Sequence, residues 1–260
     1  MSQLSRGGVT LSYDEAGTGD PPIVLVHGGM VNRTNFAPQL QHFSGRHRTV
    51  AVDLRGHGKS DAPQQDYTIA GFADDVAWMC RELNVSKPVV VGHSMGGLVT
   101  IEVAARTPDL PAAIVIMDSP VVPPAWFVEA LRPLVAAMRT PAYRDAINQF
   151  MGGFIGFADH SDRRTRLLND MMAAPQQVTA SSLESYIAYD SVAAAAACKV
   201  PVLYISAGMW FTDVNRFKEL CPQLVTAQTV GSGHYHQLEV PDQVNAMIDR
   251  FLVTALRPSK

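Results

Sequence analysis

Short, continuous runs of apolar residues constrain the fold of this chain most strongly. Four of them lie in the first 120 residues, at Ile23–Val26, Thr49–Val52, Val89–Val91 and Ala113–Met117. Strands without polar alternation are typically buried on both faces, as in a parallel sheet covered by helices. From Ile69 to Leu83, apolar residues recur at spacings of three or four, which indicates an amphipathic helix. This alternation predicts an α/β fold with a doubly wound, mostly parallel sheet flanked by helices.

The pattern changes after residue 120. Residues 121–197 read as helices and loops without a clear strand, and strand-like sequence resumes at Pro201–Ile205. A final helix carries an apolar face near the end of the chain. We therefore predict a core over residues 1–120 and 198–260, interrupted by an inserted helical cap over residues 121–197.

Aromatic residues are concentrated in the predicted cap, where eight lie between Val121 and Asp190. Most are expected to pack the insertion onto the core. Because ligand pockets are mostly apolar, some are also expected to line one. The candidates for a substrate pocket, from the cap and from loops beside it, are Met30, Trp126, Phe154, Trp210 and Tyr235.

A possible nucleophile lies in Gly92-His93-Ser94-Met95-Gly96, which matches G-x-S-x-G between a strand and a helix-like run. A serine on such a sharp strand-to-helix turn needs small neighbours, and the glycines provide them. Its hydroxyl also needs a base. His234 follows the last predicted strand, in the expected order after the serine, and His236 is its competitor.

Four motifs in this order resemble the α/β-hydrolase family. His27-Gly28-Gly29 is similar to its oxyanion loop, and the stretch 53–60 is similar to D-x-R-G-x-G-x-S. The serine turn is similar to its nucleophile elbow, and residues 233–241 resemble a G-H-x(4)-E-x-P ending, which favours His234 as the base. The resemblance implies an oxyanion hole from the N–H groups of Gly29 and Met95. Ser94, where the dehalogenase and epoxide-hydrolase branches have aspartate, implies acyl chemistry.

The acid that should orient the histidine is missing from its usual place in the family, where this chain has Trp210 or Phe211. Two substitutes remain. Asp213 lies slightly further on and is also a good N-cap for a following helix. Asp118 ends an earlier strand, a place that a minority of the family uses. We favour Asp118 because it ends a rigid strand at the edge expected to carry the site.

Composition excludes some partners. The net charge of −3 argues against a nucleic-acid-binding protein. No segment reads as a signal peptide or a membrane span, and three scattered cysteines fit a reducing compartment, so we expect a cytoplasmic location. We expect a monomer or a homodimer with a small-molecule substrate.

These observations predict a serine hydrolase that cleaves a small, mostly apolar ester or lactone. Ser94 would attack, His234 would move the proton, and Asp118 or Asp213 would orient the histidine. This chemistry needs no metal or organic cofactor. The same triad also serves carbon–carbon bond hydrolases and lyases, and a ligand receptor that turns over slowly or not at all is a third possibility.

Overall fold

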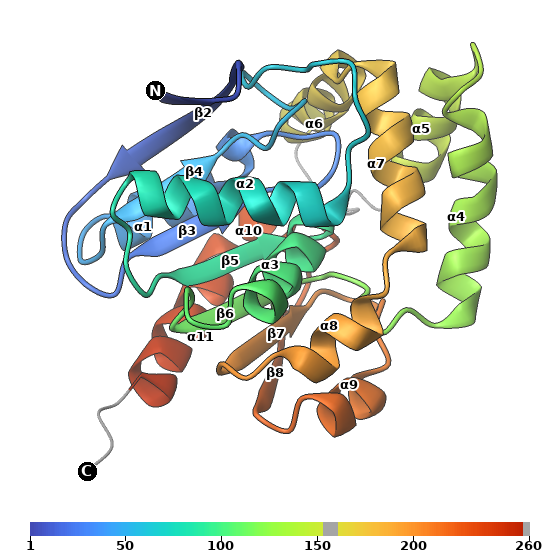
Figure 1. Ribbon diagram of the computed structural model, residues 1–260. Helices are drawn as coiled ribbons and strands as arrows, with labels where there is room; N and C mark the ends of the chain where they lie inside the picture. Colours follow the sequence, from blue (N-terminus) through green and yellow to red (C-terminus); the bar gives the residue numbers. More distant parts are fainter. Residues whose placement is uncertain (153–160, 257–260) are drawn as a thin grey trace.

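The computed structural model describes residues 1–152 and 161–256 and is built around one central sheet of eight strands (Figure 1). The strand order across the sheet is β1-β2-β4-β3-β5-β6-β7-β8. The strands are β1 (Ser2–Arg6), β2 (Val9–Ala16), β3 (Ile23–Val26), β4 (Thr49–Val52), β5 (Val89–His93), β6 (Ala113–Met117), β7 (Val202–Ser206) and β8 (Leu224–Gln228).

Six of the strands, from β4 to β8 across the sheet, are parallel, which confirms the predicted fold class. The apolar runs in the sequence form five of these strands because both of their faces are buried, whereas β8 has mostly exposed residues. The antiparallel hairpin β1–β2, which joins the sheet beside β4, was not predicted. The residues of β1 are mostly exposed and polar, so their sequence carries no burial pattern.

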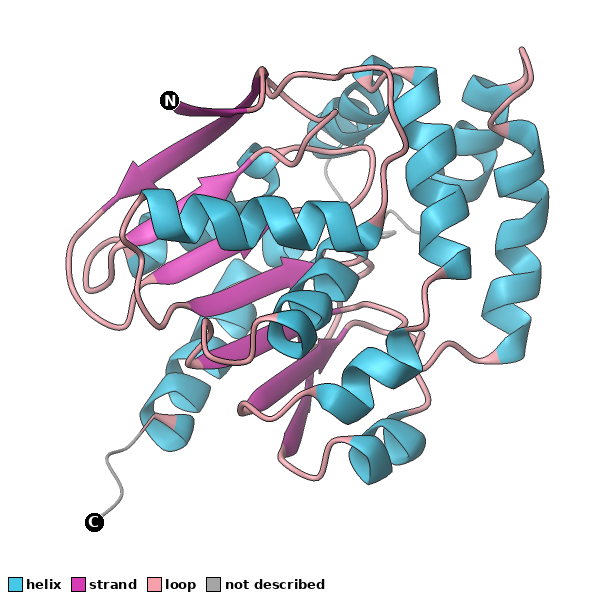
Figure 2. Cartoon of the chain, viewed as in Figure 1, coloured by secondary structure: helices cyan, strands magenta, loops and turns pink. Residues whose placement is uncertain are grey.

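Helices cover both faces of the sheet (Figure 2). Alternate residues of each strand point to opposite faces, so Val24 packs in one apolar cluster and Leu25 in the other, and both are fully buried. One cluster includes residues of α2 (Ile69–Glu82), α3 (Met95–Arg106), α8 (Ser191–Ala197) and α9 (Val214–Leu220). The other includes residues of η1 (Arg33–Phe36), α1 (Ala37–Phe43) and α11 (Pro241–Ala255).

Four helices between β6 and β7 gather beyond the carboxyl ends of the parallel strands (Figure 1). Their apolar side chains form a third cluster, which also takes in Met30, Phe211 and Tyr235 from loops of the core. The fifth helix of this segment, α8, packs instead on α3, although the sequence placed it in the cap. The four are α4 (Ala125–Ala137), α5 (Tyr143–Gly152), α6 (Ser161–Ala173) and α7 (Gln176–Ala188).

Serine side chains fasten α7 to the core. Ser181 Oγ accepts a hydrogen bond from the Tyr67 N–H at 2.7 Å, and Ser185 Oγ accepts one from the Ile69 N–H at 3.0 Å. Both donors lie at the amino end of α2, where backbone N–H groups lack partners within the helix. Helix α7 is thereby held beside the edge of the sheet at which the strands end.

No helix in residues 1–152 and 161–256 has the length and apolar character that crossing a membrane requires.

Candidate active site

Ser94 occupies a strained turn at the centre of the sheet edge where the parallel strands end. It follows β5 directly and precedes the first residue of α3, and its φ is +53°. A side chain on Gly92 would lie 2.1 Å from the Gly96 carbonyl oxygen, and one on Gly96 would lie 2.2 Å from the Val26 carbonyl oxygen. Only glycine fits at either position. Positive φ at a non-glycine residue is uncommon and concentrates at functional sites.

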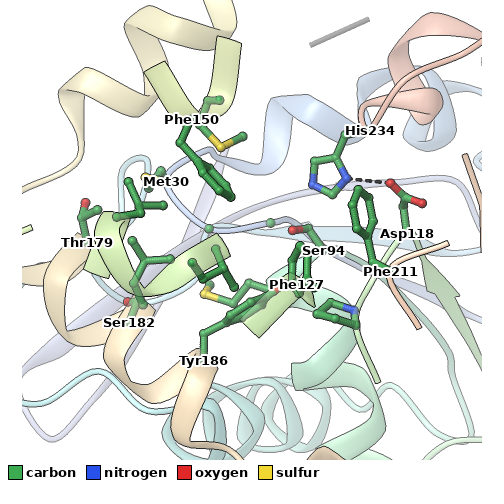
Figure 3. Close-up of a pocket in the computed structure, with 18 of the residues that line it drawn as sticks. Met30, Ser94, Asp118, Phe127, Phe150, Thr179, Ser182, Tyr186, Phe211 and His234 are labelled. Carbon is green, nitrogen blue, oxygen red and sulfur yellow. Dashed lines mark hydrogen bonds and ion pairs between the residues drawn. The ribbon is translucent and has the colours of Figure 1, made fainter. Parts of the chain in front are cut away.

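Asp118 and His234 are in direct contact. Asp118 follows β6 and is fully buried, and its Oδ1 accepts a hydrogen bond from the Ala207 N–H at 2.9 Å. Its Oδ2 lies 2.7 Å from His234 Nδ1. Because a carboxylate accepts, Nδ1 carries the proton, and the neutral ring has its lone pair on Nε2. Figure 3 shows the His234 ring between Asp118 and Ser94.

Asp213, the alternative acid, has a different role. Its side chain caps α9 by accepting a hydrogen bond from the Arg216 N–H at 3.0 Å, and its own N–H donates to the Val122 carbonyl at 2.8 Å. The structure therefore brings Asp118, and not Asp213, to His234. The place where most of the family has its acid is apolar here, and Phe211 packs edge-on against the His234 ring at 5.8 Å.

Two further histidines shape the loop that carries His234. His93 Nε2 donates a hydrogen bond to the His234 carbonyl at 2.8 Å, and burial holds the pKa of His93 well below 6.5. His236 is fully buried beside Thr229, and burial lowers its pKa to about 4. The Glu239 carboxylate fixes the start of the loop by accepting from the Gly233 N–H at 2.8 Å. His93 and His236 are thus neutral, structural side chains.

The predicted oxyanion loop lies against the serine turn. A side chain on Gly28 would lie 3.2 Å from Ser94 Cβ, and one on Gly29 would lie 3.5 Å from Met95 Sδ. Both Gly29 and Met95 border the cavity that contains Ser94. Met95 is the first residue of α3, so its N–H has no acceptor within the helix.

Tyr186 on α7 is a site residue that the sequence did not reveal. It lines the cavity that also contains Ser94. Burial raises its pKa above 10, so the phenol remains protonated at neutral pH. No motif marks Tyr186, because only the folding of the cap over the sheet places it beside Ser94.

The cavity around Ser94 encloses about 740 Å³, counting its mouth, and its walls are mostly apolar. Met30 and Tyr235, two of the pocket candidates from the sequence, line it. Its walls also include several apolar side chains that were not predicted: Phe127, Leu131, Leu134, Phe150, Met151, Leu183 and Phe211.

Trp126 and Trp210, the two tryptophans among the pocket candidates, are not among the residues that line this cavity. Trp126 is 50% exposed and packs on the outer side of Phe127, with ring centroids 5.7 Å apart. Trp210 stacks on Tyr204 at 5.9 Å, away from the cavity. An aromatic residue is as useful for joining cap to core as for lining a pocket, so composition alone does not separate the two uses. Phe154 lies outside the described residues.

In the part of the chain that the structure describes, no cluster of three or more histidine, cysteine or acidic side chains is arranged to hold a metal ion.

The sheet, the serine turn and the histidine–aspartate contact define a class of protein. Residues 21–241 match the family model for the alpha/beta hydrolase fold, and the chain belongs to this family. Among solved structures, it superposes on an enol-lactonase from Burkholderia xenovorans LB400 with a TM-score of 0.86 and 24% identity, over 97% of this chain and 100% of that one. An esterase from Thermogutta terrifontis gives a TM-score of 0.86 and 23% identity, over 99% and 100% of the two chains. At these identities the likeness shows the fold.

Curated relatives match over shorter stretches. A 2-(acetamidomethylene)succinate hydrolase of Mesorhizobium japonicum is 39% identical over 116 residues, which is 45% of this chain and 41% of the relative. Epoxide hydrolase 4 of Mus musculus is 28% identical over 193 residues, or 71% of this chain and 53% of the relative. The chain thus matches about half or less of the length of these relatives. The relatives named above are hydrolases that share this fold and act on different kinds of bond.

Proposed function

We propose that the protein is a serine hydrolase that cleaves a small, mostly apolar ester or lactone through an acyl-enzyme on Ser94. The observation that carries the proposal is the 2.7 Å contact between Asp118 and His234, in the cavity that also contains Ser94 on its strained turn. A serine, a histidine and a buried carboxylate in this relation form the arrangement that activates a hydroxyl for acyl transfer.

The reaction proceeds in two halves. His234 Nε2 takes the Ser94 hydroxyl proton while Oγ bonds to the substrate carbonyl carbon, whose π electrons move to its oxygen. The tetrahedral intermediate then collapses, the carbon–oxygen ester bond breaks, and His234 returns the proton to the leaving alcohol. Water repeats the sequence on the acyl-enzyme, releasing the acid and restoring Ser94. Asp118 stabilises the imidazolium that forms in each half.

The backbone N–H groups of Gly29 and Met95 would stabilise the negative oxygen of both intermediates. One such donor typically contributes about 10²- to 10³-fold to the rate. Met95 also stands at the amino end of α3, where the helix dipole favours negative charge.

The apolar walls of the cavity favour a substrate with a largely hydrocarbon acyl or alcohol part. An enol-lactonase and an esterase are among the similar structures, which is consistent with such substrates. An ester or a lactone presents the same carbonyl chemistry to Ser94, since a lactone is an internal ester.

A substrate panel tests the proposal. It contains p-nitrophenyl esters of short and medium chains, aliphatic lactones and β-diketones, each assayed with the wild-type protein and with Ser94→Ala. We expect turnover of esters or lactones that Ser94→Ala abolishes. Cleavage of β-diketones alone would instead indicate a carbon–carbon hydrolase, and tight binding without product release would indicate a receptor.

A further inference from the structure

Helix α7 turns two hydroxyl side chains toward the mostly apolar cavity. Thr179 and Ser182 lie one turn apart on the same side of the helix, and both line the cavity that contains Ser94. They are only 2% and 3% exposed. Figure 3 shows them on the side of the cavity opposite His234 and Asp118. The cavity therefore has a second polar end, away from the reacting groups.

Neither hydroxyl has a hydrogen-bond partner among the described residues. A serine or threonine within a helix can bond to the carbonyl of the preceding turn, and these two do not. Burying an unpaired hydroxyl is unfavourable, so native structures rarely contain one without a reason. Their neighbours Ser181 and Ser185, on another side of the same helix, are both paired with backbone N–H groups of the core.

His57 adds a third unpaired polar atom to the same cavity. Its ring is 3% exposed, and its Nδ1 lies 3.0 Å from the Arg55 carbonyl oxygen, which can only accept. Nδ1 therefore carries the proton, and Nε2, which has no partner among the described residues, is an acceptor. Burial lowers the pKa of His57 to about 3, so the ring is neutral at neutral pH.

The hydrogen-bond donors and acceptors of Thr179, Ser182 and His57 determine which chemical group they can bind. The His57 lone pair requires an O–H or N–H donor, whereas the two hydroxyls can donate or accept. A carboxylate fits poorly, because no lysine or arginine is among the described residues that line the cavity. The complementary group is uncharged and carries a donor, as an alcohol or a secondary amide does.

We propose that Thr179, Ser182 and His57 form a subsite that binds a hydroxyl or secondary amide group of the substrate, at the end remote from the scissile carbonyl. The proposal rests on the proposed function, since it assigns a substrate class to the same cavity. A subsite of this kind explains why deeply buried polar side chains without a hydrogen-bond partner lie in a cavity with mostly apolar walls.

Matched esters test the subsite. The assay compares p-nitrophenyl esters of straight-chain acids, from butanoic to octanoic, that end in a methyl, hydroxyl, acetamido or carboxylate group. Because the subsite is fixed relative to Ser94, one chain length should show a maximum. There we expect the hydroxyl or acetamido ester to exceed the methyl ester about tenfold in kcat/KM, which corresponds to one or two neutral hydrogen bonds. The carboxylate ester should be the poorest.

Substitutions on α7 show which side chains cause the preference for hydroxyl and acetamido esters. Thr179→Val keeps the shape of the side chain and Ser182→Ala removes one atom. Each should lower the ratio of kcat/KM for the hydroxyl ester to that for the methyl ester about two- to tenfold. Thr179→Ser should retain the preference. Ser181→Ala is the matched control on the same helix: its hydroxyl faces α2, so this variant should keep the wild-type preference.

A binding measurement separates this proposal from the proposed function. Phenyl ketones with the same chains and end groups lack the ester bond, and calorimetry gives their Kd without turnover. Inactivity toward every ester, with tighter binding of the hydroxyl ketone that Thr179→Val abolishes, would overturn the proposed function and support the subsite. Equal Kd values for methyl and hydroxyl ketones, or a preference that survives both Thr179→Val and Ser182→Ala, would overturn the subsite.

Discussion

Asp118 has both carboxylate oxygens occupied, one by a backbone N–H of the loop after β7 and the other by His234. Its φ of +46° repeats the unusual conformation of Ser94, at the end of the neighbouring strand. Two non-glycine residues in this region, side by side on one sheet edge, are expected where the surrounding structure holds a site in place. The sequence offered Asp118 and Asp213 as acids, and only the three-dimensional position of His234 separates them.

Replacing Asp118 with asparagine should remove the acid while keeping its shape. We expect Asp118→Asn to lower kcat about 10³- to 10⁴-fold, because the amide no longer favours the His234 tautomer or stabilises the imidazolium. Asp213→Asn is the control and should stay within about twofold of wild type, because asparagine caps a helix as well as aspartate does. Steady-state kinetics with the best ester substrate measures both effects. A large loss of kcat in Asp213→Asn with little change in Asp118→Asn would assign the acid to Asp213.

Tyr186→Phe tests whether a hydroxyl of the cap contributes to the reaction. Tyr186 lines the cavity that contains Ser94, and we expect loss of its hydroxyl to lower kcat/KM about two- to tenfold, the range for one neutral hydrogen bond. The phenol is protonated throughout the neutral range, so its removal should leave the shape of the pH–rate profile unchanged. An unchanged kcat/KM would show that this hydroxyl does not contribute to the reaction.

At the scale of elements, strands were easier to predict than helices of the cap. All the parallel strands except β8 are buried on both faces, so their apolar runs are visible in the sequence. Helix α7 carries hydroxyl groups toward both the cavity and α2, which removes the apolar stripe by which a packed helix is recognised. The pocket residues that the sequence missed lie mostly in such cap helices, whose orientation depends on tertiary packing.

The serine turn depends on close backbone contacts between β5, α3 and β3. We expect Gly96→Ala to lower the free energy of unfolding by about 3 kcal/mol or more, or to prevent folding, because its side chain would meet the backbone of Val26. Gly45→Ala, at an exposed position where a side chain lies 3.6 Å from the nearest atom, should change it by less than about 1 kcal/mol. Urea denaturation of both variants makes the comparison. Equal stabilities would contradict the packing described for the turn.

For the whole molecule, four buried histidines predict loss of stability in mild acid. Burial lowers the pKa of His27, His57, His93 and His236 below 6.5, to about 3 for His57 and about 4 for His236. Below pH 6.5 the unfolded chain therefore binds more protons than the folded protein. The stability that these residues preserve above pH 6.5 is lost as the pH falls toward the folded pKa values.

Between about pH 6 and pH 5, His57 and His236 should each lower the free energy of unfolding by about 1 kcal/mol per pH unit. Urea denaturation at a series of pH values measures the slope. His236→Asn should reduce this slope by the contribution of one proton. A free energy of unfolding that stays constant over this range would contradict the burial of neutral rings.

The central claim is that Ser94 is the nucleophile, activated by His234 and Asp118. Reaction with a fluorophosphonate, followed by mass spectrometry of peptides, tests it most directly because the reagent labels a serine only where the hydroxyl is activated. We predict a single labelled peptide that contains Ser94, slower labelling in Asp118→Asn, and none in a folded Ser94→Ala variant. A well-folded wild-type protein that resists the reagent, or equal labelling of Ser94→Ala, would contradict the claim.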